Sequence, residues 1–145
     1  VMTKQHLFNG YSVAKETLVF ENGILCDKTD KIRNNEWRSG LQMEEYLHKT
    51  LIDVATPDMT FEELYYLMND VIVKKGFLNL DFLGNLGHSI VKNKNDRIYT
   101  EKGNHQRLSD VKMFTFEPHI SLPDSKYGYK REDIYYFDNG KLIQL

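Results

Sequence analysis

Three residues whose side chains suit catalysis or metal binding lie in separate segments of the C-terminal half of the sequence. His88 follows a glycine in GHSI, Glu117 lies in FTFEPHI, and Glu132 lies in KREDIYYF. Taken singly, each has an ordinary interpretation, as a turn histidine, a carboxylate on the outer face of a strand, and a charge at the start of a strand. Taken together, they form a His/Glu/Glu set that neighbouring strands can bring to one face of a sheet.

Carboxylates with one imidazole are suitable ligands for Mn, Co, Fe or Zn rather than for a thiolate-bound metal. Two bridging carboxylates are what a two-metal hydrolytic site needs to activate a water between the ions. Pro118 removes a backbone donor, which favours an edge or a bend where the Glu117 carboxylate projects. His119 adds a second imidazole beside it, as a further ligand, an acid/base group or a contact to substrate.

The segments that carry these residues have a β-type pattern. Phe114 and Phe116 alternate with polar residues, which predicts a strand with one apolar face. Asn-Gly pairs at 9–10, 22–23 and 139–140 each lie between β-type runs and predict tight hairpins. Residues 1–32 are therefore expected to form a β-meander, and the C-terminal residues a final hairpin.

The middle of the chain has a helical pattern. Apolar residues predict one helix over 39–55, and a capping box of Thr60 and Glu63 opens a second, which ends before Gly76. After it the pattern is again β-type, in the runs NLDFLGNLGHSI, DRIYTEKG, VKMFTFEPHISL and REDIYYF-DNG-KLIQL. This order predicts an α+β fold, with helices packed on one face of a mostly antiparallel sheet.

Composition excludes several classes. A chain of 145 residues with 41% hydrophobic residues fits one folded domain, and a net charge of −2 argues against nucleic-acid binding. No apolar run approaches the roughly 18 residues of a membrane span. Cys26 is the only cysteine, so no internal disulfide can form, and we expect a reducing, cytoplasmic location.

The motifs around His88, Glu117 and Glu132 resemble those of the pita-bread metallopeptidases, a superfamily that includes methionine aminopeptidase, aminopeptidase P, prolidase and the metal-free creatinase. The separations of 29 residues (117 − 88) and 15 residues (132 − 117) are close to the arrangement of prolidase and aminopeptidase P. The helical segment with ATPDMTFEEL also resembles the family. The resemblance covers about residues 39–145 and implies a pita-bread-like fold with a curved, mostly antiparallel sheet.

The resemblance implies a role for each residue. His88 would bind one of two divalent ions, Glu117 would bind metal and act as general base, and Glu132 would bridge both ions. The implied activity is hydrolysis of N-terminal or Xaa-Pro peptide bonds, with His119 near the peptide substrate. The sequence departs from the pattern in three places: His119 replaces a glycine, Lys130 replaces an arginine, and Thr100 stands where a histidine usually precedes Glu101.

The family places two further metal-binding aspartates earlier, eleven residues apart on a hairpin, and two registers satisfy that spacing. If the turn is at 22–23, Asp27 and Glu16 fall on the two positions and are candidate ligands. If the turn is at 9–10, Ala14 and Thr3 fall there, and neither can replace an aspartate. The sequence leaves both registers open.

The full pita-bread fold has roughly 220 to 260 residues, so residues 1–145 are expected to form one partial domain. Its open sheet edge favours pairing with a second copy or with a missing N-terminal half. Three functional hypotheses remain: a two-metal peptidase, a pita-bread protein without a working dinuclear site (a metal-free enzyme or a binding module), and an unrelated α+β domain.

Overall fold

The computed structural model describes the backbone of residues 2–8 and 11–145, and the side chains from Lys15 onward. The strands are β1 Met2–Phe8, β2 Tyr11–Glu21, β3 Ile24–Cys26, β4 Leu78–Asn79, β5 Phe114–Phe116, β6 His119–Ser121, β7 Tyr129–Asp138 and β8 Lys141–Gln144. The two α-helices are α1 Asn35–Val54 and α2 Phe61–Lys74. Short 3₁₀ turns are η1 Thr29–Lys31, η2 Lys94–Asp96 and η3 Leu108–Asp110.

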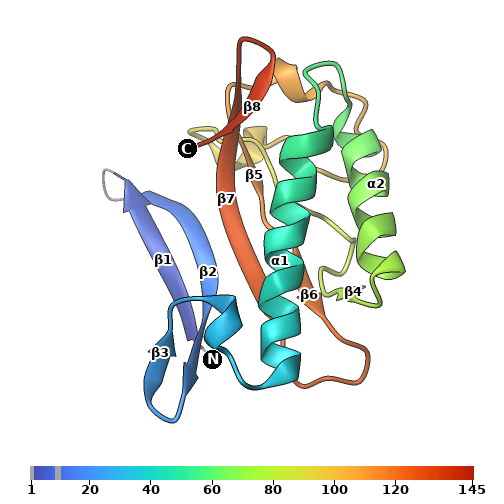
Figure 1. Ribbon diagram of the computed structural model, residues 1–145. Coiled ribbons are helices and arrows are strands. Elements are labelled where there is room, and N and C mark those ends of the chain that lie inside the picture. The colour runs from blue at the N-terminus through green and yellow to red at the C-terminus, as the bar shows by residue number, and fades with distance from the viewer. Residues whose placement is uncertain (1, 9–10) are drawn as a thin grey trace.

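All strand pairings of the described residues are antiparallel. The sheet runs in the order β1-β2-β7-β6-β4, while β3 pairs with β2, and both β5 and β8 pair with β7. The long strand β7 therefore joins the N-terminal hairpin to the rest of the sheet (Figure 1). The ladder between β2 and β7 is short: it pairs Lys15 with Glu132 and Glu16 with Arg131. The predicted antiparallel sheet is thus confirmed.

Helix α1 packs against β7, and α2 packs beside α1 and β4, in agreement with the α+β prediction (Figure 1). Their buried faces form the core with the aromatic residues of the sheet, and this core includes Leu47, Leu51, Phe61, Leu64, Met68, Phe114, Phe116 and Tyr135. Helix α2 begins with the predicted capping box of Thr60 and Glu63. Helix α1 begins four residues earlier than predicted, because the Asn34 side chain caps it by accepting the N–H of Trp37 at 3.1 Å.

The connection between β4 and β5 differs most from the prediction. The runs NLDFLGNLGHSI and DRIYTEKG were expected as strands. Within them only Asn79 belongs to a strand, β4, and the other pairings are isolated bridges from His88 to Tyr99 and from Ser89 to Phe114. One physical reason is Asp81, whose Oδ1 accepts the N–H groups of Leu83 (3.0 Å) and Asn85 (2.9 Å). These bonds favour a turn over a ladder.

Two of the three predicted Asn-Gly hairpins are confirmed. Asn22 and Gly23 have φ of 51° and 77°, and Asn139 and Gly140 have φ of 48° and 79°, as a tight turn between twisted strands requires. The pair at 9–10 lies outside the described residues. No helix of the described chain is long and apolar enough to cross a membrane.

A polar cluster is buried between α1 and β7. His48 Nε2 donates to the Arg131 carbonyl at 3.2 Å, and its Nδ1 accepts the Tyr135 hydroxyl at 2.7 Å. Burial lowers the pKa of His48 to about 3, so the ring is neutral in the folded protein at neutral pH. Burial also raises the pKa of Glu44 well above its usual value, although the charges of Arg131 and Lys130 act in the opposite direction.

The Glu44 carboxyl predicts a pH-dependent stability. Folding raises the pKa of Glu44, so protonated Glu44 contributes to the free energy of unfolding. This contribution is complete below about pH 4.5 and is lost as the pH rises toward the pKa of the folded state. Glu44→Gln is expected to remove this loss, so the variant should gain up to about 1.4 kcal/mol over the wild type per pH unit in that window. Urea unfolding at pH 5 and pH 8 measures the difference.

The matched control is Glu45→Gln, because Glu45 is exposed on the same helix. The contribution of His48 has the opposite sign: it grows as the pH rises from about 3 to 6.5, and it cancels between the variant and the wild type. If Glu44→Gln and Glu45→Gln change the free energy of unfolding equally at both pH values, the assignment of Glu44 as a neutral buried acid is wrong.

Candidate functional site

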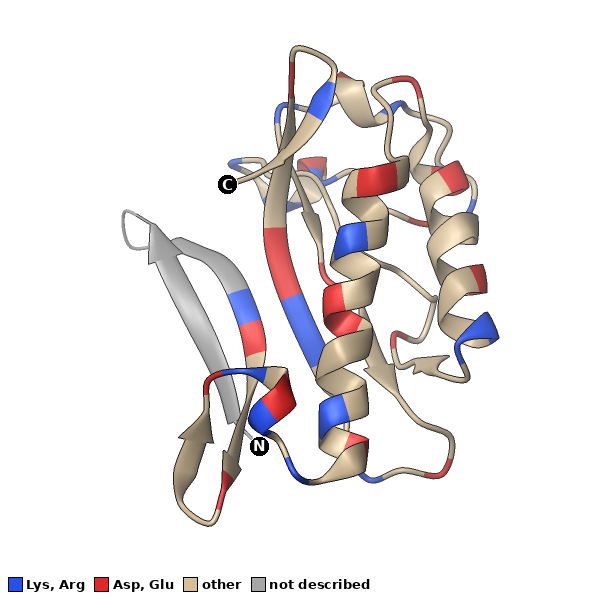
Figure 2. Ribbon diagram, viewed as in Figure 1, with Lys and Arg blue, Asp and Glu red and all other residues tan. Residues whose placement is uncertain are grey.

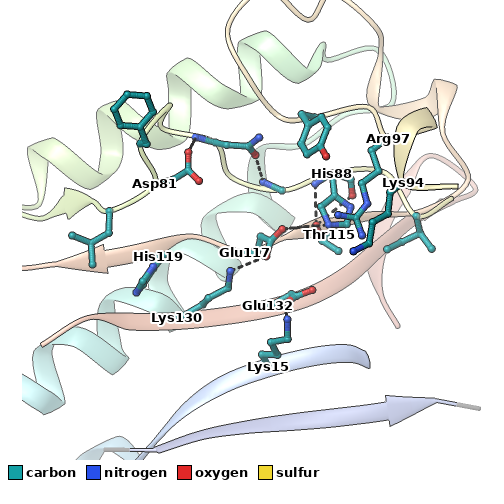
Figure 3. Close-up of a pocket in the computed structure, with 16 residues that line it drawn as sticks. Lys15, Asp81, His88, Lys94, Arg97, Thr115, Glu117, His119, Lys130 and Glu132 are labelled. Carbon is teal, nitrogen blue, oxygen red and sulfur yellow. Dashed lines mark hydrogen bonds and ion pairs between the residues drawn. The ribbon is translucent and has the colours of Figure 1, made fainter. Parts of the chain in front are cut away.

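A polar cleft of about 650 Å³ lies between the β4–β5 connection and strands β2, β5, β6 and β7. Its lining includes the three residues that the sequence singled out, together with the second imidazole and two lysines: His88, Glu117, Glu132, His119, Lys15 and Lys130 (Figure 3). The predicted His/Glu/Glu set is therefore brought together, by three segments that are far apart in the sequence.

His88 is fixed through its backbone. Its N–H donates to Thr115 Oγ1 at 2.9 Å, and its carbonyl accepts the Thr115 N–H at 2.8 Å. The ring Nδ1 lies 2.9 Å from the Ser89 carbonyl, which can only accept, so Nδ1 carries a proton. Nε2 faces Glu117, but 3.5 Å from Oε1 it is too far for a strong hydrogen bond.

Glu117 directly follows β5, at the bend that the following proline imposes. Its N–H donates to the Leu86 carbonyl at 2.8 Å, which turns the side chain into the cleft. Its Oε2 accepts a hydrogen bond from Lys130 Nζ at 2.8 Å (Figure 3). The Glu117 side chain is only 18% exposed, so this ion pair is shielded more than a surface pair would be.

Glu132 lies on β7 directly opposite Lys15 of β2. Opposed residues of antiparallel strands project to the same face, so both side chains enter the cleft. Lys15 Nζ lies 3.2 Å from Glu132 Oε2, and Glu132 is almost fully buried. Figure 2 shows the basic residue of β2 beside the acidic stretch of β7. The second cleft carboxylate thus also has an ammonium partner.

His119 lies at the end of the cleft nearest β4, beside Lys130. Partial burial lowers its pKa, and the positive charge of Lys130 acts in the same direction, so the ring is neutral near pH 7. A neutral imidazole can both donate and accept, which suits contact with a polar ligand.

The two further candidate ligands lie elsewhere. Glu16 neighbours Lys15 on β2, so its side chain projects to the opposite face, where it lines a separate cavity of about 60 Å³ with Glu44 and Arg131. Asp27 follows β3 and is exposed; Lys31 Nζ lies 2.7 Å from its Oδ1 and lowers its pKa. Neither residue lines the cleft with His88.

The alternative register also supplies no described ligand. Among the described strands of the N-terminal part, β2 pairs with β7, whereas β1 and β3 pair with β2. Within the β1–β2 hairpin the backbone of Ala14 pairs with His6 and that of Thr3 with Thr17, while the side chains of Ala14 and Thr3 lie outside the described part of the chain. The side chain that faces Glu132 from β2 is Lys15, which the sequence analysis did not single out.

The cleft residues do not fit a two-metal centre. No group of three or more His, Cys, Asp or Glu side chains in the described part of the chain is arranged to hold a metal ion. Two divalent ions need several anionic oxygens, but here each cleft glutamate is already neutralised by a lysine ammonium. Lys15 is one of two adjacent charged residues in YSVAKETLVF, and only the register of β2 against β7 shows that it, rather than Glu16, shares a face with Glu132.

A family model for "Metallopeptidase family M24" matches residues 20–139, which include His88, Glu117 and Glu132. The chain belongs to metallopeptidase family M24. Its resemblance to the pita-bread enzymes is thereby confirmed, and the hypothesis of an unrelated domain is excluded.

Relatives of this M24 chain include peptidases. It is 30% identical over 117 residues to the Xaa-Pro dipeptidase of Lactobacillus helveticus, an alignment that covers 74% of this chain and 32% of the relative. Its fold is similar to a prolidase from Thermococcus sibiricus (TM-score 0.56, 23% identity, 71% of this chain and 28% of that one). It is also similar to the dipeptidase PepE of Mycobacterium ulcerans (TM-score 0.60, 18% identity, 90% and 36%). The chain thus spans about a third of the length of these relatives.

Proposed function

We propose that this M24 protein binds short peptides in the cleft without a dinuclear metal centre. The observation that carries the proposal is the pairing of both cleft carboxylates with lysines, Glu117 with Lys130 and Glu132 with Lys15. In a two-metal site the same carboxylates must be free to bind the ions. Peptides are the proposed ligands because the relatives are named as dipeptidases and a prolidase.

The charges of the two lysines support a binding role. An ammonium held 2.8 Å from a carboxylate provides the opposite charge that a metal would otherwise supply, but it supplies no Lewis acid to activate a water. The cleft instead offers hydrogen-bonding groups to a ligand: the neutral ring of His119, the Nε2 atom of His88 and the ion-paired carboxylate of Glu117.

The competing hypothesis is a two-metal peptidase that uses Mn, Co, Zn or Fe. It is supported by the family and by the convergence of His88, Glu117 and Glu132 on one cleft. In that account Lys15 and Lys130 must release their carboxylates before any ion can bind. The two accounts therefore differ in whether divalent metal is needed for peptide binding.

The test is calorimetric titration of the protein with the dipeptide Ala-Pro, first with EDTA and then with Mn²⁺ or Co²⁺. We expect the same dissociation constant under both conditions and an intact dipeptide after incubation. Glu117→Gln should weaken binding about tenfold, because it removes one charged partner of the cleft. The matched control is Asp138→Asn, which changes an exposed carboxylate at the far end of β7.

Binding that appears only after metal is added, or metal-dependent release of proline, would favour the two-metal peptidase. If the wild type does not bind the dipeptide in either buffer, peptide binding is excluded as the role of the cleft.

A further inference from the structure

The carboxyl of Glu44 lies on the face of α1 that packs against β7, and it is buried without a hydrogen-bond partner. The residue is 3% exposed, and no described protein group donates to either Oε1 or Oε2. The Arg131 N–H favours the charged form of the carboxyl, but it does not reach hydrogen-bond geometry. An unpaired buried polar group costs free energy, so this carboxyl is a weak point of the packed interface.

A cavity of about 60 Å³ adjoins the Glu44 carboxyl at the place where α1, β2 and β7 meet. Thr17 of β2, Leu41 of α1 and Arg131 of β7 line it together with Glu44. A polar cavity needs only about 10–15 Å³ to hold one water, so this cavity has room to hydrate a carboxylate. A movement of β2 away from β7 would open the cavity to bulk solvent.

The contact between β2 and β7 is narrow. Their ladder has only two residue pairs. At the next position the Thr17 side chain replaces the ladder: its Oγ1 accepts the Lys130 N–H at 2.9 Å and donates to the Lys130 carbonyl at 3.2 Å. The ion pair of Lys15 and Glu132 is the remaining recorded link. Few interactions must therefore break for this part of β2 to leave β7.

The end of β2 is held independently of β7. Glu21 Oε2 accepts the Arg33 N–H at 2.7 Å, and Oε1 accepts the Asn34 N–H at 2.6 Å, so the end of the strand is tied to the start of α1. This end can stay in place while residues 15–17 separate from β7. The arrangement is that of a hinge, with Glu21 at the fixed end.

The cations near Glu44 are already used. Titratable side chains around it are Glu45 and His48 on α1, Glu16 on β2, and Lys130, Arg131, Asp133 and Tyr135 on β7. Arg131 Nε donates to Asp133 Oδ2 at 2.7 Å, and Lys130 Nζ binds Glu117 in the cleft. Burial raises the pKa of Glu44 well above its usual value, whereas His48 stays neutral above pH 5. Once ionised, the Glu44 carboxylate must therefore be solvated by water.

We propose that Glu44 is a pH-sensitive switch for the docking of β2. Its neutral carboxyl lets α1, β2 and β7 close around the cavity, and its ionisation admits water and releases residues 15–17 from β7. The released segment carries Lys15 away from Glu132, so the switch also changes the charge of the cleft on the other face of β7. This inference does not depend on the peptide ligand of the proposed function.

Hydrogen–deuterium exchange with mass spectrometry tests the switch in the wild type, Glu44→Gln and the control Glu45→Gln from pH 5 to pH 9. The amides of α2 serve as the internal reference for global unfolding. In the wild type and in Glu45→Gln, protection of residues 15–21 relative to α2 should fall by up to about tenfold per pH unit, until the pH reaches the pKa of folded Glu44. In Glu44→Gln this ratio should stay constant.

Two results would overturn the switch. A parallel loss of protection in residues 15–21 and in α2 would mean that Glu44 affects only global unfolding. A constant ratio in the wild type would mean that the ionised carboxylate is neutralised in place, for example by Arg131. Circular dichroism verifies folding, and the pH dependence of the wild type alone decides the question if Glu44→Gln does not fold.

A second readout tests the effect on the cleft. Acetic anhydride modifies free lysine amines, and the reactivity of Lys15 is measured relative to the exposed Lys112 at each pH. We expect a higher relative reactivity in the wild type than in Glu44→Gln at pH 8 and similar values at pH 5. Equal values for the two proteins at pH 8 would show that Lys15 stays with Glu132 and would contradict the inference.

Discussion

Lys15→Ala is expected to lower the free energy of unfolding by about 1–3 kcal/mol, because it leaves the buried Glu132 carboxylate without its ammonium partner. The value lies below that of a fully buried ion pair because the Lys15 side chain is 37% exposed and water screens part of the interaction. Urea unfolding of the single variant measures the loss.

A double-mutant cycle isolates the pair. Lys15→Ala combined with Glu132→Gln should recover most of the loss, since neither charge then remains unpaired in the cleft. Lys112→Ala, at an exposed lysine that forms no ion pair with a described side chain, is the control and should change stability by less than about 0.5 kcal/mol. If the changes in the free energy of unfolding caused by Lys15→Ala and Glu132→Gln simply add in the double variant, the Lys15 ammonium does not stabilise the Glu132 carboxylate.

Gly87→Ala is expected to cost at least about 3 kcal/mol and to abolish the cleft. Gly87 has φ of 149°, and a Cβ atom there would lie 2.1 Å from the Thr115 carbonyl oxygen, so the backbone of β5 would have to move. That movement would break the hydrogen bonds between His88 and Thr115 that fix the imidazole. Thermal unfolding together with dipeptide titration measures both effects.

The control for this substitution is Gly103→Ala. Gly103 also has a positive φ of 87°, but a Cβ atom there would meet no other atom within 4 Å. It therefore carries the backbone strain without the clash, and we expect a loss of about 1 kcal/mol and unchanged dipeptide binding. Equal losses for the two variants would mean that the close approach to Thr115 is unimportant.

Local signals in the sequence were sufficient for much of the fold. The capping box at Thr60 and Glu63 marked the start of α2, and the Asn22-Gly23 and Asn139-Gly140 pairs marked two hairpins. The β4–β5 connection was wrongly predicted as strands, because its apolar residues suggested sheet. Its conformation is decided in part by the Asp81 side chain, which binds backbone N–H groups two and four residues further along and so competes with a strand ladder.

The site was predictable only in part. His88, Glu117 and Glu132 were found from their residue types and spacing, and the structure places all three in one cleft. The role of Lys15 was missed, because its meaning depends on the register that pairs it with Glu132 across two strands. A one-residue change of register would reverse the face of every β2 side chain, and the sequence left that register open.

The same register explains where Glu16 and Asp27 lie. Asp27 follows β3, which pairs with β2 alone and has no contact with β7 in the sheet, whereas Glu16 is one residue from Lys15 and so faces α1. Both were predicted as metal ligands, and neither lines the cleft that contains His88. The separation of Glu16 and Asp27 in the sequence matches that of the family's two aspartates, but it did not predict where the two side chains lie in the structure.

In this account, lysine ammonium groups neutralise the two cleft carboxylates in place of metal ions. Calorimetric titration with Mn²⁺ and Co²⁺, combined with elemental analysis after dialysis, tests it most directly. We predict that the wild type retains less than one equivalent of metal per chain at micromolar concentrations, with no difference from Glu132→Gln. Retention of two equivalents by the wild type, lost in Glu132→Gln, would contradict the account.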